Sequence, residues 1–413
     1  MIRSLLLLLA SCAGLAACAS GDDPQPEPAA VPESLEEAYI ADITRDLADD
    51  DMQGRNEGTT ESAEARARII AEMGACGIEP AGEGSSYEQP ITAGQGTNVL
   101  GVIPGTDPDL RDRYVVVSAH YDHIGACGGA ICNGANDNAA GVATILGVGC
   151  AVAQAPLTRS VLIAAWDAEE PATFLTDAMG SEFWVNEPTV PLSSVDVAIA
   201  LDLVGGDLWP GFDAHFLIGA ELSPQVASAV NRAARPDGLD AHRLGLHMVE
   251  ETILGRQPWS DYDAFRNEEV PVLFASNGQN REYHTPDDEF ELLDTPRMAL
   301  QAQYLYAIVR ELGDATETPV FDAAGVAFAT DAETAVMVLD AALADGGLVD
   351  QYGLSGTSRT NLEADRELAA EVAASLEAGT GMSNDELLGL RTATQRIMCH
   401  AGSTYGEGTC NSL

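Results

Sequence analysis

The stretch from residue 115 to residue 141, VVVSAHYDHIGACGGAICNGANDNAAG, constrains the fold more than any other part of the chain. It opens with a β-branched apolar run, residues 114–119, that is typical of a buried strand. His120 and Asp122 follow at the carboxyl end of that strand, and the small apolar residues 139–155 predict a helix. A buried strand that leads through polar residues into a helix is typical of an α/β protein, in which ligands bind where strands end.

Three more apolar runs predict buried strands, and each carries or precedes a residue that can bind a metal. These runs are residues 160–166, 197–203 and 271–276. The associated side chains are Glu169 and Glu170, then Asp202, then His284. Because the carboxyl ends of parallel strands meet at one edge of a sheet, we expect these side chains to converge. Imidazole nitrogens and carboxylate oxygens suit zinc, so the sequence predicts a metal site there.

Helical periodicity supplies the other layers of the predicted fold. Residues 36–51, 61–74 (capped by Thr60) and 298–312 predict helices, and residues 97–103 predict a further strand. The fold class is therefore α/β, a mixed and mostly parallel central sheet with helices on both faces. The helix-like runs after residue 316, which are residues 331–343, 361–378 and 384–397, contain no motif and predict a small C-terminal helical extension.

Taken in order, these motifs resemble the co-catalytic zinc aminopeptidases, family twenty-eight of the metallopeptidases. The matching motifs are His120-x-Asp122, Asp137 in Gly-Ala-Asn-Asp-Asn-Ala-Ala-Gly, Glu169-Glu170, Asp202 and Tyr283-His284-Thr285. The likeness runs from about residue 46 to residue 294 and includes the turn at Gly54-Arg55-Asn56. The resemblance implies the zinc-dependent exopeptidase fold.

The same resemblance implies two Zn²⁺ per chain. It assigns His120 and Asp202 to one ion, Glu170 and His284 to the other, and Asp137 to a bridging position. Two cations roughly 3.5–4 Å apart need a shared anionic ligand and hold a water between them. The implied reaction is hydrolysis of a peptide bond through a bridging hydroxide.

Further side chains have roles that the resemblance implies. Asp122 would accept a hydrogen bond from the far ring nitrogen of His120 and orient the ring. Glu169 would be the general base and would return its proton to the leaving amine. His123 is expected to line the mouth of the site or to pack beside it rather than to bind metal. The candidates for substrate binding and oxyanion stabilisation are Tyr262, Trp259 and Tyr283. Tyr262 is a departure, because many relatives have His after this Ser-Asp pair.

The resemblance favours an aminopeptidase acting on a peptide substrate, and three alternatives stay open. A carboxypeptidase of the same family would use the same ligands. A glutaminyl cyclase would bind one zinc. A non-catalytic receptor on this scaffold would have no use for Glu169.

The charge of the chain limits its partners. With 65 acidic residues against 20 basic ones, and no lysine, the formal charge is −45. Such a surface repels nucleic acid and anionic lipid headgroups, so we expect no nucleic-acid partner and membrane contact only through an anchor. The oligomeric state stays open.

The amino terminus is typical of an exported protein. Residues 1–17 combine Arg3 with a short apolar run and end at Leu15-Ala16-Ala17-Cys18, which resembles a bacterial lipoprotein box. This implies cleavage before Cys18, lipidation of its thiol, and a location in the bacterial cell envelope, periplasmic or anchored to the outer membrane. An ordinary secretory signal is the alternative. Residues 18–33 then form a Pro-rich acidic tether, 34–315 the zinc peptidase domain, and 316–413 the helical extension.

Six cysteines remain after Cys18, and export permits disulfides among them. The expected local pairs are Cys127 with Cys132 and Cys399 with Cys410. Cys76 and Cys150 lie in or beside helical patterns and are interpreted as plain buried residues.

Overall fold

A computed structural model describes residues 30–252, 255–402 and 406–413. The predicted signal peptide, the lipidation site at Cys18 and most of the tether therefore lie outside the described residues. Residues Pro32–Leu413 form one compact unit, which contains both the predicted peptidase domain and the predicted C-terminal extension.

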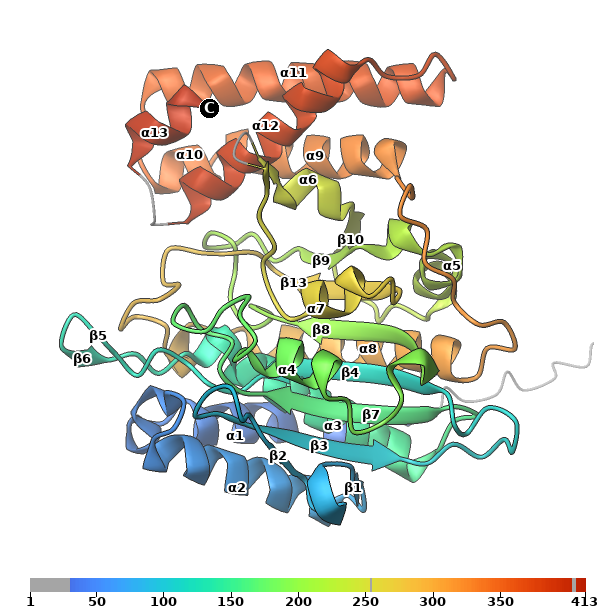
Figure 1. The fold of residues 1–413 in the computed structure, drawn as a ribbon. Helices are drawn as coiled ribbons and strands as arrows, with labels where there is room; N and C mark the ends of the chain where they lie inside the picture. Colours follow the sequence, from blue (N-terminus) through green and yellow to red (C-terminus); the bar gives the residue numbers. More distant parts are fainter. Residues whose placement is uncertain (1–29, 253–254, 403–405) are drawn as a thin grey trace, which may run out of the picture. The chain divides into compact units, whose positions relative to one another are not determined.

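Within the described residues, a mixed sheet of nine strands forms the centre of this unit (Figure 1). The strands are β1 (Glu79–Pro80), β2 (Glu88–Pro90), β3 (Thr97–Ile103), β4 (Tyr114–His120), β7 (Ser160–Trp166), β8 (Val195–Leu201), β9 (His215–Ile218), β10 (Ala241–Leu244) and β13 (Val272–Ser276). Their order is β1-β3-β7-β4-β8-β13-β9-β10, with β2 paired to β3. The central strands β7, β4, β8 and β13 run parallel, whereas β3 and β9 run antiparallel to them. The fold class is the predicted one.

The central strands are buried on both faces. Along β4, Val115 and Val117 point into one hydrophobic core and Val116 points into the other. This is the two-residue alternation of a strand. Strands covered on both faces are apolar at nearly every position, which is why the sequence alone predicts them.

Helices cover both faces of the sheet. The first core receives α1 (Glu37–Leu47), α2 (Thr60–Ala75), α3 (Ala140–Gln154), α5 (Pro224–Arg232) and α8 (Thr295–Gly313). The second receives α4 (Gly180–Asn186), α6 (Leu246–Glu250), α7 (Tyr262–Asn267), α9 (Phe328–Leu343), α10 (Leu348–Gln351), α11 (Gly356–Glu377) and α12 (Asn384–Ala401). The C-terminal helices, orange to red in Figure 1, thus share one core with the sheet.

Some boundaries differ from prediction for local reasons. The predicted helix 36–51 ends earlier, at Leu47, and a 3-10 turn follows over Asp50–Arg55. The cap of α2 is Thr59 rather than Thr60, because the Thr59 hydroxyl accepts the N–H of Ser62. The sequence alone does not predict the short elements β9, β10, α5, α6 and α7. Segments of so few residues show no clear repeat of apolar positions from which a helix or strand can be recognised.

Three disulfides join described residues. Cys127–Cys132 closes the small hairpin of β5 (Ala126–Cys127) and β6 (Ala130–Ile131), and Cys399–Cys410 ties α12 to α13 (Glu407–Ser412). Both are the expected local pairs. The interpretation of Cys76 and Cys150 as plain buried residues is wrong, because the packing of α2 against α3 brings them together across a sequence separation of 74.

A two-stranded hairpin, β11 (Glu251–Thr252) with β12 (Gly255–Arg256), follows α6. None of the helices in the described ranges is both long enough and apolar enough to cross a membrane.

Candidate metal centre and active site

The ends of the four parallel strands bring the predicted ligands together. His120 is the last residue of β4, and Asp202 directly follows β8. Glu169 and Glu170 lie in the turn after β7, and His284 lies in the loop after β13. Asp137 comes from a π-helical turn, Ala135–Ala139, that leads into α3. Parallel strands end at one edge of the sheet, so residues up to 164 positions apart in sequence become neighbours.

Asp137 lies between two groups of donors. Its Oδ1 atom is 3.3 Å from Nε2 of His120, and its Oδ2 atom is 3.2 Å from Nε2 of His284. Beyond these contacts, Nε2 of His120 is 3.5 Å from Oδ1 of Asp202. On the other side, Nε2 of His284 is 2.9 Å from Oε2 of Glu170. The two oxygens of one carboxylate thus face two different imidazoles.

The donor set fits a metal centre. Zinc–ligand bonds of about 2.0–2.2 Å at tetrahedral angles place neighbouring donor atoms about 3.3 Å apart, close to the spacing seen here. Within the described part of the chain, four of these buried atoms make no hydrogen bond of acceptable geometry: Nε2 of His120, Nε2 of His284, Oδ2 of Asp137 and Oδ1 of Asp202. A buried polar atom without a partner is costly, and one cation bound at each of the two donor groups would satisfy all four.

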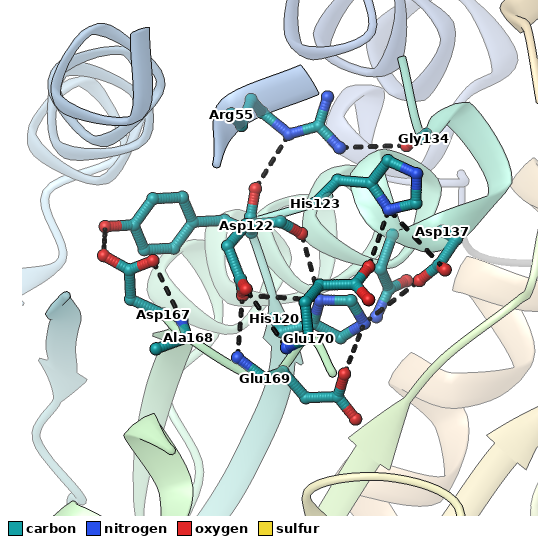
Figure 2. A network of polar contacts seen from close by, with 12 residues as sticks. Arg55, His120, Asp122, His123, Gly134, Asp137, Asp167, Ala168, Glu169 and Glu170 are labelled. Atoms are coloured by element: carbon teal, nitrogen blue, oxygen red, sulfur yellow. Dashed lines mark hydrogen bonds and ion pairs between the residues drawn. The ribbon is translucent and has the colours of Figure 1, made fainter. Parts of the chain in front are cut away.

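Asp122 positions the two neighbouring glutamates, as Figure 2 shows. Its carboxylate accepts the backbone N–H of Glu169 at 3.1 Å and that of Glu170 at 3.3 Å. The predicted contact with His120 is longer, with 3.6 Å between Nδ1 and Oδ1 of Asp122. The same Nδ1 lies 3.2 Å from the main-chain oxygen of Asp122. Asp122 therefore orients His120 mainly through its backbone and the glutamates through its side chain.

Two residues that the sequence did not single out hold the ligand-bearing loops. Arg55 is fully buried and donates to the carbonyls of Tyr121 at 2.8 Å and Gly134 at 2.9 Å (Figure 2). Burial lowers the pKa of Arg55 to about 10, although carboxylates including Asp288 raise it in part. The Asp288 carboxylate in turn accepts the N–H of Asp137 at 3.0 Å. The only sequence signal for Arg55 was its place in the turn that the family resemblance included.

His123 is closer to the centre than the sequence predicted. Its Nδ1 atom is 2.7 Å from Oε1 of Glu170 and 3.6 Å from Oδ2 of Asp137. Its ring centroid is 5.6 Å from that of His284. His123, Asp137, Glu170 and His284 together form a group whose donor atoms could hold one ion. The signal available beforehand was its position three residues after His120 in the same motif.

Three non-glycine residues with a positive φ angle lie at these loops. Ala168, Leu203 and His284 adopt positive φ angles of 61°, 56° and 56°, and each is a predicted ligand or lies close to one in the chain. Such conformations cost about 1–3 kcal/mol per residue and occur mainly where surrounding structure imposes them for function. Position 134 also requires glycine, because its φ angle is 60° and a Cβ atom there would lie 2.4 Å from the ring of His123.

The predicted base, Glu169, lies beside the donor group that contains His120 and Asp202. Its Oε2 atom is 3.9 Å from Nε2 of His120. Burial raises the pKa of Glu169 well above its usual range; His120 opposes this shift, and the carboxylates of Asp202 and Asp261 add to it. Cations bound at the two groups would lower this pKa again, which would leave Glu169 able to accept a proton.

A cavity of about 760 Å³ opens beside Glu169 and Glu170, and we call it the catalytic cavity. Trp259 and Tyr283 line it, and their roles in substrate binding or oxyanion stabilisation stay predictions. Tyr262 does not belong to its lining. That side chain is fully buried, its hydroxyl donates to the carboxylate of Glu250, and it accepts the N–H of Trp259 at 3.0 Å. The predicted role of Tyr262 in substrate binding is therefore wrong, because α7 directs the ring into the core.

The model of peptidase family M28 matches residues 98–309, which is more than half of the chain and includes every predicted ligand. The chain belongs to peptidase family M28. Membership identifies it as a hydrolase of the peptidase class, in agreement with the resemblance found in its motifs. This M28 peptidase is 25% identical over 296 residues to the uncharacterized protein YfbL of Escherichia coli strain K12, and the match covers 65% of this chain and 85% of YfbL.

Solved structures share the fold of this M28 peptidase. A Zn-dependent exopeptidase from Parabacteroides distasonis matches with a TM-score of 0.51 and 19% identity, over 68% of this chain and 99% of that one. BSAP, a zinc aminopeptidase from Bacillus subtilis, matches with a TM-score of 0.53 and 15% identity, over 70% of this chain and 98% of that one. At these identities the likeness establishes the architecture, a mixed sheet flanked by helices.

Proposed function

We propose that this M28 peptidase is a dinuclear zinc aminopeptidase that removes residues from the amino terminus of peptides. The observation that carries the proposal is the position of Asp137, whose two oxygens face His120 and His284 separately at 3.3 and 3.2 Å. A carboxylate in this position can bridge two cations, each completed by one further acidic side chain. A zinc aminopeptidase from Bacillus subtilis with this fold supports the proposal.

Five residues of this chain would bind the two zinc ions. His120 with Asp202 would hold one zinc ion, and Glu170 with His284 the other, with Asp137 between them. When bound, the ions would supply a water of lowered pKa and polarise the carbonyl of the scissile bond.

Glu169 would take a proton from this water as the water oxygen bonds to the carbonyl carbon. It would then pass that proton to the amine nitrogen as the carbon–nitrogen bond breaks. Asp122 holds the N–H groups of both Glu169 and Glu170, so the two adjacent side chains can serve water and metal respectively.

Charge in the catalytic cavity favours the amino end of a peptide. Glu169 and Glu170 line it, and none of its lining residues within the described chain is Arg or His. A carboxypeptidase needs a cation to receive the terminal carboxylate of its substrate. An ammonium group is instead attracted to an acidic cavity in a chain with a formal charge of −45.

A peptide panel with measured zinc content tests the proposal. We expect hydrolysis of peptides with a free amino terminus, loss of hydrolysis on amino-terminal acetylation, and two zinc ions per chain. Chelation should abolish turnover and added zinc restore it. Hydrolysis of acetylated peptides from the carboxyl end would instead indicate a carboxypeptidase. Cyclisation of amino-terminal glutamine with one zinc per chain would indicate a glutaminyl cyclase, and zinc binding without turnover a receptor.

We also propose that the protein is exported and anchored through a lipid on Cys18. The disulfides among the described cysteines support an oxidising compartment outside the cytoplasm. Cys18→Ser should move the protein from the membrane fraction to the soluble fraction after cell lysis. Continued fractionation of Cys18→Ser with membranes would contradict the anchor.

A further inference from the structure

The catalytic cavity is bounded by two parts of the chain that are distant in sequence. One side carries Glu169, Glu170 and Trp259 from the loops around the sheet. Gln395 and Met398 of α12 also line the cavity, and this helix lies beyond the part of the chain that the M28 family model matches. The C-terminal extension is therefore a boundary of the space in which substrate must bind.

A narrow apolar recess of about 80 Å³ adjoins the catalytic cavity. The sheet side of the recess is formed by Phe216, Ile218 and Phe274, and the extension side by Ala335, Val338 and Ile397. At roughly 10–15 Å³ for each water-sized group, the recess can take a leucyl, methionyl or phenylalanyl side chain. Its apolar lining favours hydrocarbon over water.

The recess and the catalytic cavity are continuous through shared residues. Val249, Trp259, Gln279 and Met398 line both spaces. Met398 is a half-buried residue of α12, so this helix contributes the side chain at the junction. A peptide whose scissile bond lies near Glu169 can thus extend one side chain from the catalytic cavity into the recess.

The extension is held firmly enough to act as a fixed surface. The buried Asp331 carboxylate of α9 accepts the N–H of Gly245 at 2.7 Å and lies 2.9 Å from Nε2 of His247. The side chain of Gln395 donates to the main-chain oxygen of Glu251. These contacts tie α9 and α12 to residues 245–251, a segment that itself lines both spaces through Val249.

We propose that α9 and α12 complete the specificity pocket of this peptidase, and that the pocket selects a large apolar side chain on the substrate residue next to the scissile bond. This inference rests on the proposed aminopeptidase function for the identity of that residue. It adds that specificity depends on the extension and not only on the matched family domain. Met398 is the specificity-determining residue at the entrance, and Ala335 lies on the far side.

Substitutions in the recess test the proposal through the ratio of kcat/KM for leucyl and alanyl 4-nitroanilides. Ala335→Leu fills the recess and should lower this ratio about tenfold or more, since one or more methylenes in such a pocket change selectivity by roughly 10–200-fold. Met398→Ala widens the entrance and should raise the phenylalanyl-to-leucyl ratio. The matched control is Leu388→Ala, an apolar residue of the same helix that is 58% exposed, and it should leave every ratio unchanged.

A binding measurement separates this proposal from the proposed function. Calorimetry on the zinc-loaded Glu169→Gln protein, which should not hydrolyse the amide, should show tighter binding of L-leucinamide than of L-alaninamide, and adding Ala335→Leu should remove the difference. If leucinamide discrimination holds but no aminoacyl substrate is hydrolysed, the aminopeptidase function is wrong and the pocket stands. If substrates are hydrolysed but both ratios in the folded variants stay within twofold of wild type, the pocket is wrong. Should Ala335→Leu not fold, Met398→Ala decides alone.

Discussion

Asp122→Asn is the substitution that best tests how this site is assembled. The Asp122 carboxylate is buried, with 1% of the residue exposed, and its two oxygens accept the N–H groups of Glu169 and Glu170. Asparagine has nearly the same shape but replaces one acceptor oxygen with an NH₂ donor. One of the two buried N–H groups would then face another donor.

The size of the effect follows from that lost contact. A hydrogen bond to a charged acceptor contributes about 1.5–3 kcal/mol, and about 1.4 kcal/mol corresponds to a tenfold change. If the loss of this hydrogen-bond energy destabilises the orientation in which Glu169 acts as the base, kcat should decrease by about 10- to 150-fold. Loss of a partner that orients metal ligands has a similar effect, about 10- to 100-fold.

The assay is kcat at saturating substrate and zinc, with zinc content and melting temperature measured on the same preparations. Asp196→Asn is the matched control, since Asp196 is also buried and accepts from Arg159 at 2.7 Å, but it lies near the start of β8. It therefore lies at the opposite edge of the sheet from the metal centre. We expect Asp196→Asn to lower the melting temperature and to retain kcat. A kcat for zinc-replete Asp122→Asn within twofold of wild type, or an equal loss in the control, would refute the positioning role.

Three further predictions concern the base, a disulfide and pH. Glu169→Gln should bind zinc normally and lower kcat by a factor of about 10²–10⁴, which is the usual contribution of a general base. Asp137→Ala should instead lose zinc. Near-normal turnover of Glu169→Gln would contradict the assignment of Glu169 as the base. Replacing Cys76 and Cys150 with Ala, a pair 74 residues apart, should reduce the free energy of unfolding by roughly 4 kcal/mol, against roughly 3 kcal/mol for Cys399 and Cys410, which are 11 apart. Denaturant unfolding measures both values, and the reverse order would contradict the loop-entropy argument. Burial lowers the pKa of His215 from 6.5 to about 4, so the neutral ring contributes stability that is present above pH 6.5 and is lost as pH falls towards 4. This contribution is about 3 kcal/mol. His215→Asn should therefore reduce the decrease in unfolding free energy between pH 6.5 and pH 4. A decrease as steep as that of the wild type would exclude His215 as the source of this pH dependence.

The extension shows where sequence patterns stop being informative. Its helices were predicted as residues 331–343, 361–378 and 384–397, close to the observed α9, α11 and α12. Their place beside the catalytic cavity was not predicted, because the apolar stripe of a helix does not specify which surface will cover it. The error at Tyr262 has the same origin. Its neighbours in sequence belong to the site, but α7 directs its hydroxyl to Glu250.

The sequence by itself determined the strands and the candidate ligands, because both leave local signals. Strands buried on both faces, such as β7, are nearly continuous apolar runs, and the predicted ends of β7 match the observed ones. Ligands that follow such strands, His120 and Asp202 among them, must meet at one edge of the sheet. Only the tertiary structure decided what holds and surrounds that site. Arg55 reaches a carbonyl 79 residues away, and Asp288 accepts N–H groups from residues more than 150 positions earlier. Such contacts depend on how the chain folds, because distant segments must come together before they form. They leave no recognisable pattern in the sequence between the two partners.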